Sequence, residues 1–363
     1  MTLVPGVIRL KEVNENVIQM LPWNNSLPEV YRLGIEFIKT IRQIESPGLT
    51  ALMKIISFFG SGYFFTPIIL FIFWCIDEKK GLRMGVLILV SAWINSFLKS
   101  LFRHPRPFNI EPSLGLATVS GYGFPSGHAQ MSFIFFILAA VWFGHLFTEK
   151  KPMVFIQRIH FRRIILRAFT SFIILAIGFT RLYLGVHFPT DVLAGWLLGS
   201  VILAVWFIPG PFLTERLVAA GIRAQNISVA AAALIMNGLL PADRTIPAAF
   251  LGFCIGYNMM KQRFPFSAKV KAGGTNEKSA GIKILFFRCL VGFAGMAVLF
   301  LALTLVLPGE KSLFANIPIW GAASPFYETG LFILYGIIGF WASAAAPRLF
   351  MRMGLAQDAE NAE

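Results

Sequence analysis

Three short polar breaks in a largely apolar chain carry residue types that suit phosphate chemistry. Ionisable residues are costly at membrane depth, and where they occur they commonly mark a functional site. Each break lies where two long apolar runs meet, so all three can converge on one membrane surface if the runs form a bundle. The breaks contain, in order, Lys99 and Arg106; Ser126, Gly127 and His128; and Arg181, His187 and Asp191. We interpret the three breaks as one site.

The basic residues and one expected helix start are suited to holding a phosphoryl group. Lys99, Arg106 and Arg181 supply three fixed positive charges, and an arginine fork can hold two phosphoryl oxygens at once. Ser126 and Gly127 stand directly before an expected helix, where free backbone N–H groups and the helix dipole favour an anion. We expect these five residues to bind phosphate.

Two histidines, His128 and His187, then remain for the reaction itself. One can attack phosphorus while the other protonates the leaving oxygen, and each kind of assistance typically contributes on the order of 10²- to 10⁴-fold. Asp191 follows His187 by four residues. Its carboxylate can accept the second ring N–H of that histidine, which fixes the tautomer and stabilises the cation.

The three breaks resemble the motifs of the type 2 phosphatidic acid phosphatase family, whose membrane lipid phosphatases share a catalytic pattern with bacterial acid phosphatases and vanadium haloperoxidases. The family's Lys-x6-Arg-Pro appears at residues 99–107 and its Pro-Ser-Gly-His at residues 125–128. Its Ser-Arg-x5-His-x3-Asp appears at residues 180–191, with Thr180 in place of serine. That departure keeps a hydroxyl group. The resemblance covers about residues 27–213.

The resemblance implies a role for each site residue. His187 is the expected nucleophile that forms a phosphohistidine, Asp191 is its orienting partner, and His128 is the general acid. The phosphoryl group is expected to be bound by Lys99, Arg106, Ser126, Gly127 and Arg181. Members of the family need no metal, and Asp191 is the only acidic residue within the motifs. We expect neither a metal nor another cofactor.

The composition places these motifs in an integral membrane protein. Of 363 residues, 56% are hydrophobic and 14% are charged, far from the balance of a soluble domain. Several apolar runs reach about 20 residues, the length that an α-helix needs to cross about 30 Å of hydrocarbon. The basic residues behind the net charge of +14 gather in short loops between apolar runs, a pattern that indicates membrane topology rather than nucleic-acid binding. The three cysteines lack the spacing of a disulfide framework or a metal site.

The apolar pattern predicts an all-α fold, a polytopic transmembrane helix bundle of about nine spans with an N-terminal amphipathic interfacial helix. That first helix is expected over residues 27–46, lying in the interface or on the rim of the bundle. The spans are expected near residues 55–76, 84–102, 128–148, 164–183, 191–213, 227–241, 246–260, 284–307 and 326–347.

Three parts are expected along the chain: an N-terminal segment (1–26), a lipid phosphatase core (27–213) and a C-terminal transmembrane extension without an assigned role (214–363). The N-terminal segment has no apolar core typical of a cleaved signal. Lys and Arg concentrate in alternate loops, which are retained in the cytoplasm. The site is therefore expected on the extracytoplasmic side of an inner or plasma membrane. The basic N-terminal part conflicts with this orientation unless a further crossing lies within residues 27–46.

Three residues outside the motif positions carry weaker expectations. His104 is expected to line the site, and Asn95 is expected to hydrogen-bond within the bundle, in either a structural or a functional role. Arg288, near the end of an apolar run, is expected to be an anchor whose charge reaches the membrane surface.

The expected function is hydrolysis of a lipid phosphomonoester or pyrophosphate, with isoprenyl pyrophosphate, phosphatidic acid and phosphatidylglycerophosphate as the leading substrates. Phosphotransfer from lipid to lipid is a second possibility, and a lipid transporter or lipid-binding module that uses the same site is a third. The expected partners are the lipid phosphate substrate and membrane lipids, without nucleic acid. The sequence leaves the oligomeric state open.

Overall fold

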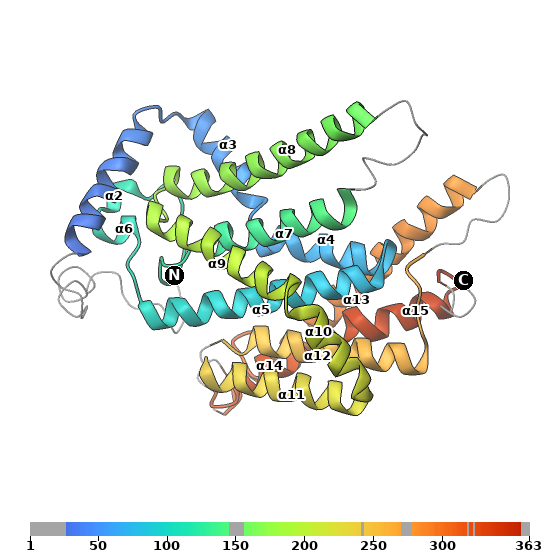
Figure 1. The fold of residues 1–363 in the computed structure, drawn as a ribbon. Helices are drawn as coiled ribbons and strands as arrows, with labels where there is room; N and C mark the ends of the chain where they lie inside the picture. Colours follow the sequence, from blue (N-terminus) through green and yellow to red (C-terminus); the bar gives the residue numbers. More distant parts are fainter. Residues whose placement is uncertain are drawn as a thin grey trace. The chain divides into compact units, whose positions relative to one another are not determined.

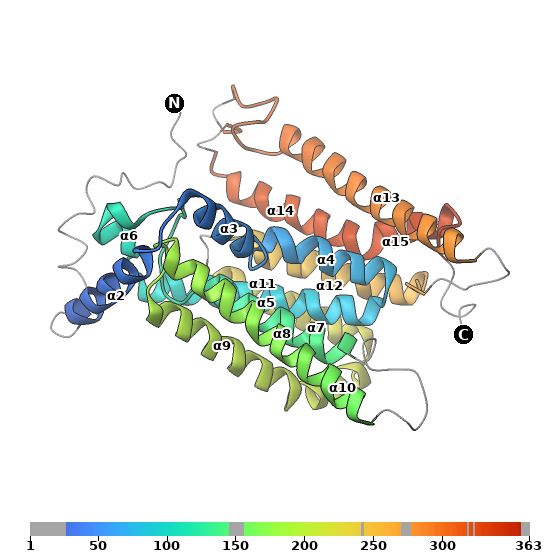
Figure 2. The same ribbon diagram turned by 90° about the horizontal axis from the view of Figure 1, so that it is seen from above.

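The computed structural model describes residues 27–144, 156–240, 243–269, 277–317, 319–321 and 324–356. Regular secondary structure across these ranges is helical (Figures 1 and 2), so the expected all-α fold is confirmed. Five helical segments among the described residues are long and apolar enough to cross a membrane, or six if one bent pair counts as a single span. The count of about nine crossings stays a prediction. The expected N-terminal segment lies outside the described residues.

The chain divides into two compact units. The first contains residues 1–65 and 94–205, and the second contains residues 66–93 and 206–363. Two helices, α4 (Gly62–Cys75) and α5 (Glu78–Phe102), contribute residues to both units. The expected division into three domains stays a prediction.

The first unit holds all three polar breaks. Its elements, besides its parts of α4 and α5, are α2 (Leu27–Arg42), α3 (Pro47–Phe58), α6 (Pro107–Ile110), η1 (Pro112–Leu114), α7 (Gly127–Phe143), α8 (Ile156–Tyr183) and α9 (Pro189–Phe207). Figure 1 shows the end of α5, the start of α7 and the turn from α8 to α9 at the same end of this unit. These are the points at which the polar breaks occur.

Helix α2 confirms the expected amphipathic helix, although it ends at Arg42 rather than near residue 46. One apolar side packs on the first unit, where Ile38 is buried against Phe188. Val30, Leu33 and Phe37 lie on a neighbouring side and are exposed. Because exposed apolar side chains on an amphipathic helix suit a lipid surface, α2 has faces for both the protein and the membrane interface.

The first expected span, residues 55–76, is wrong as a single straight helix. Helices α3 and α4 are bent by 41° at a short break between them. Gly60 lies in this break, and a Cβ atom there would lie 2.6 Å from Ile177 Cγ2 and 3.2 Å from His128 Cδ2. The break therefore lets the backbone approach α8 and the first turn of α7 closely.

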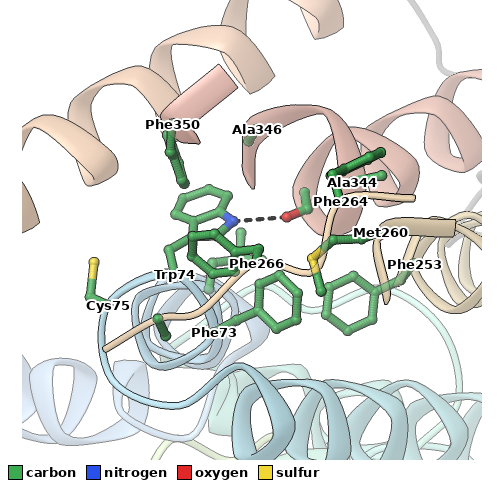
Figure 3. Close-up of a cluster of buried hydrophobic side chains, with 13 residues drawn as sticks. Phe73, Trp74, Cys75, Phe253, Met260, Phe264, Phe266, Ala344, Ala346 and Phe350 are labelled. Atoms are coloured by element: carbon green, nitrogen blue, oxygen red, sulfur yellow. Dashed lines mark hydrogen bonds between the residues drawn. The ribbon is translucent and has the colours of Figure 1, made fainter. Parts of the chain in front are cut away.

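The second unit packs around small residues and aromatic rings. Its helices, besides its parts of α4 and α5, are α10 (Gly210–Ala219), α11 (Gly221–Leu239), α12 (Thr245–Arg263), α13 (Glu277–Val306), α14 (Tyr327–Phe340), the π-helical segment η3 (Trp341–Ala345) and α15 (Ala346–Arg352). Gly252 faces Gly336 O so closely that a Cβ would lie 1.9 Å from it, as expected for helices that associate through small residues. In the aromatic core of this unit, Trp74 Nε1 donates to Ala342 O at 2.8 Å (Figure 3).

Arg288 does not reach a surface, so the expectation of a surface anchor is wrong. Its side chain is 1% exposed. The guanidinium donates to Trp74 O at 2.8 Å, Ala268 O at 2.7 Å and Leu355 O at 2.9 Å. Backbone carbonyls from three distant parts of the chain thus satisfy the buried charge, a pairing that the local sequence cannot reveal.

Candidate active site

Backbone hydrogen bonds join the three polar breaks to one another. The Gly123 N–H donates to His104 O at 2.8 Å, which ties the second break to the first. The Ser126 N–H donates to Asp191 O at 2.9 Å, which ties the second break to the third. The expected convergence of the three motifs in one place is therefore what the structure shows, although the role of each residue stays a prediction.

His187 and Asp191 form a buried pair at the turn between α8 and α9. His187 Nδ1 lies 3.2 Å from Asp191 Oδ2, and the Phe188 N–H donates to the same oxygen at 2.9 Å. His187 is 2% exposed and Asp191 is 1% exposed. Because Oδ2 accepts from the ring, Nδ1 carries the proton and Nε2 keeps its lone pair.

Gly185 gives this turn its shape. Its φ is +66°, in the left-handed region that favours glycine. A Cβ atom at this position would lie 1.8 Å from Leu114 O. The turn therefore needs glycine both for its backbone angles and for its close approach to η1, and it delivers His187 to the site.

Burial and nearby cations keep His187 neutral. Burial is the larger cause that lowers the pKa of His187 well below the ordinary histidine value, and the positive charges of Arg106, Arg181 and Lys99 lower it further. A neutral imidazole with a lone pair on Nε2 can act as a nucleophile.

Arg106 lies against both His187 and a neighbouring loop. Its Nη1 is 3.2 Å from His187 Nε2 and 2.9 Å from Val186 O. Its Nε donates to Gly121 O at 2.8 Å and its Nη2 to Ser120 O at 3.1 Å. The guanidinium of Arg106 thus joins the third polar break to the loop that precedes the second polar break.

Lys99 binds the same loop as Arg106, at the two residues that follow Gly121. Its Nζ donates to Tyr122 O at 2.7 Å and to Gly123 O at 3.0 Å. In this arrangement, the hydrogen-bond partners of Lys99 are backbone carbonyls, as are most of those of Arg106. The predicted binding of a phosphoryl group by these two residues would add to these contacts or replace them.

Arg181 is positioned by a residue that the motifs do not contain. In the last turn of α8, its Nη1 donates to Ser57 Oγ of α3 at 2.5 Å, and both residues are buried. Arg181 Nε is buried without a hydrogen-bond partner among the described residues. Such an orphaned donor is costly unless a ligand supplies the acceptor. In the sequence, Ser57 is a serine in an apolar run, and nothing nearby indicates this contact.

Ser126 and Gly127 begin α7 as expected. Ser126 is the N-cap residue, and its Oγ accepts from the Ala129 N–H at 3.5 Å. Asn95, on α5, donates to Pro125 O at 3.3 Å and to Gln130 Oε1 at 2.7 Å. Asn95 therefore holds the start of α7 in place. Of the two roles expected for Asn95, structural or functional, these contacts support the structural one.

His128 sits in the first turn of α7, beside the break between α3 and α4. No described residue forms a hydrogen bond with its ring, which leaves the imidazole available to a substrate.

Thr180, at the variant motif position, donates its hydroxyl to Ile177 O at 2.6 Å, so this hydrogen bond lies within α8. His104 packs its ring against Phe102 and Phe124.

The described residues contain no cluster of three or more His, Cys, Asp or Glu side chains that could hold a metal ion. The site brings together two histidines, a carboxylate and three cationic side chains.

Comparisons with known proteins match the part of the chain that carries the three motifs. Residues 80–211 match the PAP2 superfamily, and residues 245–358 match the family described as PAP2 superfamily phosphatase, transmembrane extension. The chain is 30% identical to phosphatidylglycerophosphatase B of Bacillus subtilis over 166 residues, which are 44% of this chain and 74% of that protein. It is 28% identical to an undecaprenyl-diphosphatase of Sulfolobus acidocaldarius over 170 residues, which are 46% of this chain and 73% of that protein.

Among solved structures, the chain is similar to the transmembrane PAP2-type phosphatidylglycerolphosphate phosphatase from Bacillus subtilis. The TM-score is 0.41 at 24% sequence identity, and the match covers 52% of this chain and 87% of that one.

Proposed function

Because the chain belongs to the PAP2 superfamily and is an integral membrane phosphoric-ester hydrolase, we propose that it removes a phosphoryl group from a lipid phosphomonoester or pyrophosphate through a phosphohistidine. The expected membership in this family is confirmed. The observation that supports the mechanism is the buried pair of His187 and Asp191, in which Oδ2 lies 3.2 Å from Nδ1 and the lone pair is left on Nε2.

In the first step, the lone pair of His187 Nε2 forms a bond to phosphorus. The bond from phosphorus to the lipid oxygen breaks, and protonated His128 gives its proton to that oxygen. The imidazole of His187 becomes a cation, which the negative charge of Asp191 stabilises. A lipid alcohol leaves from a monoester, and a lipid monophosphate leaves from a pyrophosphate.

In the second step, water replaces the histidine. His128, now neutral, takes a proton from the water molecule as the new P–O bond forms and the P–N bond breaks. Inorganic phosphate is released, and His187 returns to its neutral form. Every proton and electron pair is therefore accounted for without a metal or other cofactor.

The charge of the phosphoryl group would be met by donors at the site. Arg181 Nε is buried and has no acceptor among the described residues. Helix α7 begins at Gly127, and a helix start favours anions. Lys99 and Arg106 bring further positive charge from α5 and the loop that follows it.

The substrate class follows from the membrane setting and the relatives. The relatives named above act, by their names, on a phosphorylated glycerolipid and on an isoprenyl diphosphate. The feature common to those substrates is a phosphoryl group on a lipid. We propose isoprenyl pyrophosphate, phosphatidic acid and phosphatidylglycerophosphate as the substrates to test first, at a site that faces the extracytoplasmic side.

The test is phosphate release by purified protein from a panel of these lipids, combined with trapping of the intermediate. Wild-type protein mixed with ³²P-labelled lipid phosphate and quenched in base should retain label as phosphohistidine, which is stable in base and labile in acid. His187→Ala should retain none, and His128→Ala should slow both labelling and turnover. Label that persists in His187→Ala refutes the assigned nucleophile. Transfer of label to a second lipid without free phosphate refutes hydrolysis.

A further inference from the structure

One tyrosine outside the motifs lies against the site. Tyr31 belongs to α2, which lies outside the residues that match the superfamily. Its ring packs on Phe188 at 5.1 Å between centroids and meets the edge of His104 at 6.2 Å. Phe188 follows the nucleophile in sequence, and its N–H donates to Asp191. Tyr31 therefore reaches the site through the residue that orients the carboxylate.

Helix α2 is docked in a way that fixes this placement. Lys39 Nζ and a carboxylate oxygen of Glu111 are 2.9 Å apart, and Arg42 Nη1 donates to Ser113 O at 3.0 Å. A Cβ atom at Gly34 would lie 2.6 Å from Phe188 Cδ1. The helix thus lies directly on Phe188, at a distance that a larger residue at position 34 would not permit.

The hydroxyl of Tyr31 is a buried donor without an acceptor. It has no hydrogen-bond partner among the described residues. Leaving such a group unsatisfied is unfavourable, and in native proteins each case calls for an explanation. Burial, followed by the negative charge of Asp191, raises the pKa of Tyr31 to about 12. The hydroxyl therefore keeps its proton at neutral pH and can donate it in a hydrogen bond.

Asp191 has a matching acceptor. Both hydrogen bonds that its carboxylate accepts, from the His187 ring and the Phe188 N–H, go to Oδ2. No described residue donates to Oδ1. Phe188 thus contacts both the residue with the unsatisfied donor, Tyr31, and the residue with the unused acceptor, Asp191.

We propose that Tyr31 is a positioning residue whose hydroxyl donates to Asp191 Oδ1 through one water molecule, and so holds the carboxylate that orients His187. The inference rests on the proposed function and extends it, because it adds a group from α2 to the pair that the motifs supply. A carboxylate held at both oxygens keeps the imidazole aligned while its charge changes during the reaction.

The test compares Tyr31→Phe with a matched control. Phenylalanine keeps the ring that packs on Phe188 and removes the hydroxyl alone. We expect kcat for phosphate release to fall about tenfold with KM unchanged, because an interaction needed mainly in the transition state is lost. The control is Tyr63→Phe, which removes a hydroxyl from a residue that is 86% exposed and should leave kcat at the wild-type value.

A second background separates positioning from substrate binding. In Asp191→Asn, adding Tyr31→Phe should cause no further loss, because the carboxylate on which the hydroxyl acts is gone. An unchanged kcat in Tyr31→Phe, a rise in KM alone, or equal losses in both backgrounds overturns the inference. Wild-type protein that releases no phosphate from any lipid in the panel refutes the proposed function and the inference with it, so the two failures are distinguishable.

Discussion

The two donors that share Asp191 Oδ2 make a specific prediction about replacing this aspartate. In Asp191→Asn, one side-chain atom of the amide must face both His187 Nδ1 and the Phe188 N–H, which lie 3.2 Å and 2.9 Å from Oδ2. Since both are donors, the amide oxygen should take that place and the NH₂ group the other. The tautomer of His187 should therefore survive, while the negative charge is lost.

The expected magnitude follows from the difference between a charged and a neutral acceptor. A hydrogen bond to a charged group contributes about 1.5–3 kcal/mol and a neutral one about 0.5–1.5 kcal/mol. The loss of about 1–2 kcal/mol corresponds to a fall in kcat of about 5- to 30-fold. Asp191→Ala removes the charge and the orientation together, so we expect a fall of about 10³-fold or more.

The assay is kcat for phosphate release by purified Asp191→Asn and Asp191→Ala, with monodispersity checked by size-exclusion chromatography. Asp243→Asn is a matched control, since Asp243 accepts from Thr245 in the second unit and lies outside the motifs. Equal losses in the Asn and Ala variants would refute the reasoning. They would mean that the Phe188 N–H does not set the orientation of the amide and that the wrong tautomer forms.

The other contacts of the site carry further predictions. Ser57→Ala leaves Arg181 Nη1 without its buried partner, so kcat/KM for phosphate release should fall about tenfold. The lowered pKa of His187 keeps this residue deprotonated as pH falls. The fall in kcat/KM that its protonation causes on the acid side should therefore lie below a pH of about 6.5. Arg106→Gln removes one of the charges that lower this pKa, so the limb should move to higher pH, after correction for substrate ionisation measured separately. Finally, a Cys replacing Ser120 in a variant without the three native cysteines should react with an impermeant thiol reagent in intact cells, and protection would reverse the proposed orientation.

The spacing of the motifs was sufficient to predict which residues come together. Arg181, His187 and Asp191 lie within eleven positions of one another on either side of a single turn, so local geometry dictates much of their arrangement. Lys99 and His128 come from other helices, but each lies at a helix end near the same end of the first unit. The apolar runs similarly predicted where most of the long helices lie, although α5, α8, α11 and α13 begin about six to eight residues before the expected spans.

The residues that sequence reasoning missed are those whose partners are distant in the chain. Ser57 meets Arg181 across 124 positions, and nothing near Ser57 marks it as different from another serine in an apolar helix. The burial of Arg288 depends on carbonyls at Trp74, Ala268 and Leu355. A basic residue near a helix end therefore looks the same in sequence whether it reaches the membrane surface or the centre of a unit.

The contact between Arg106 Nη1 and His187 Nε2, at 3.2 Å, has a consequence for the enzyme between turnovers. A donor placed on that lone pair masks the proposed nucleophile and discourages a proton from binding there, because two positive charges would then meet. The proposed reactive nitrogen is therefore protected in the resting enzyme. We expect an arriving phosphoryl group to draw the guanidinium onto its own oxygens, so that the movement that binds the substrate also exposes the atom proposed to attack it.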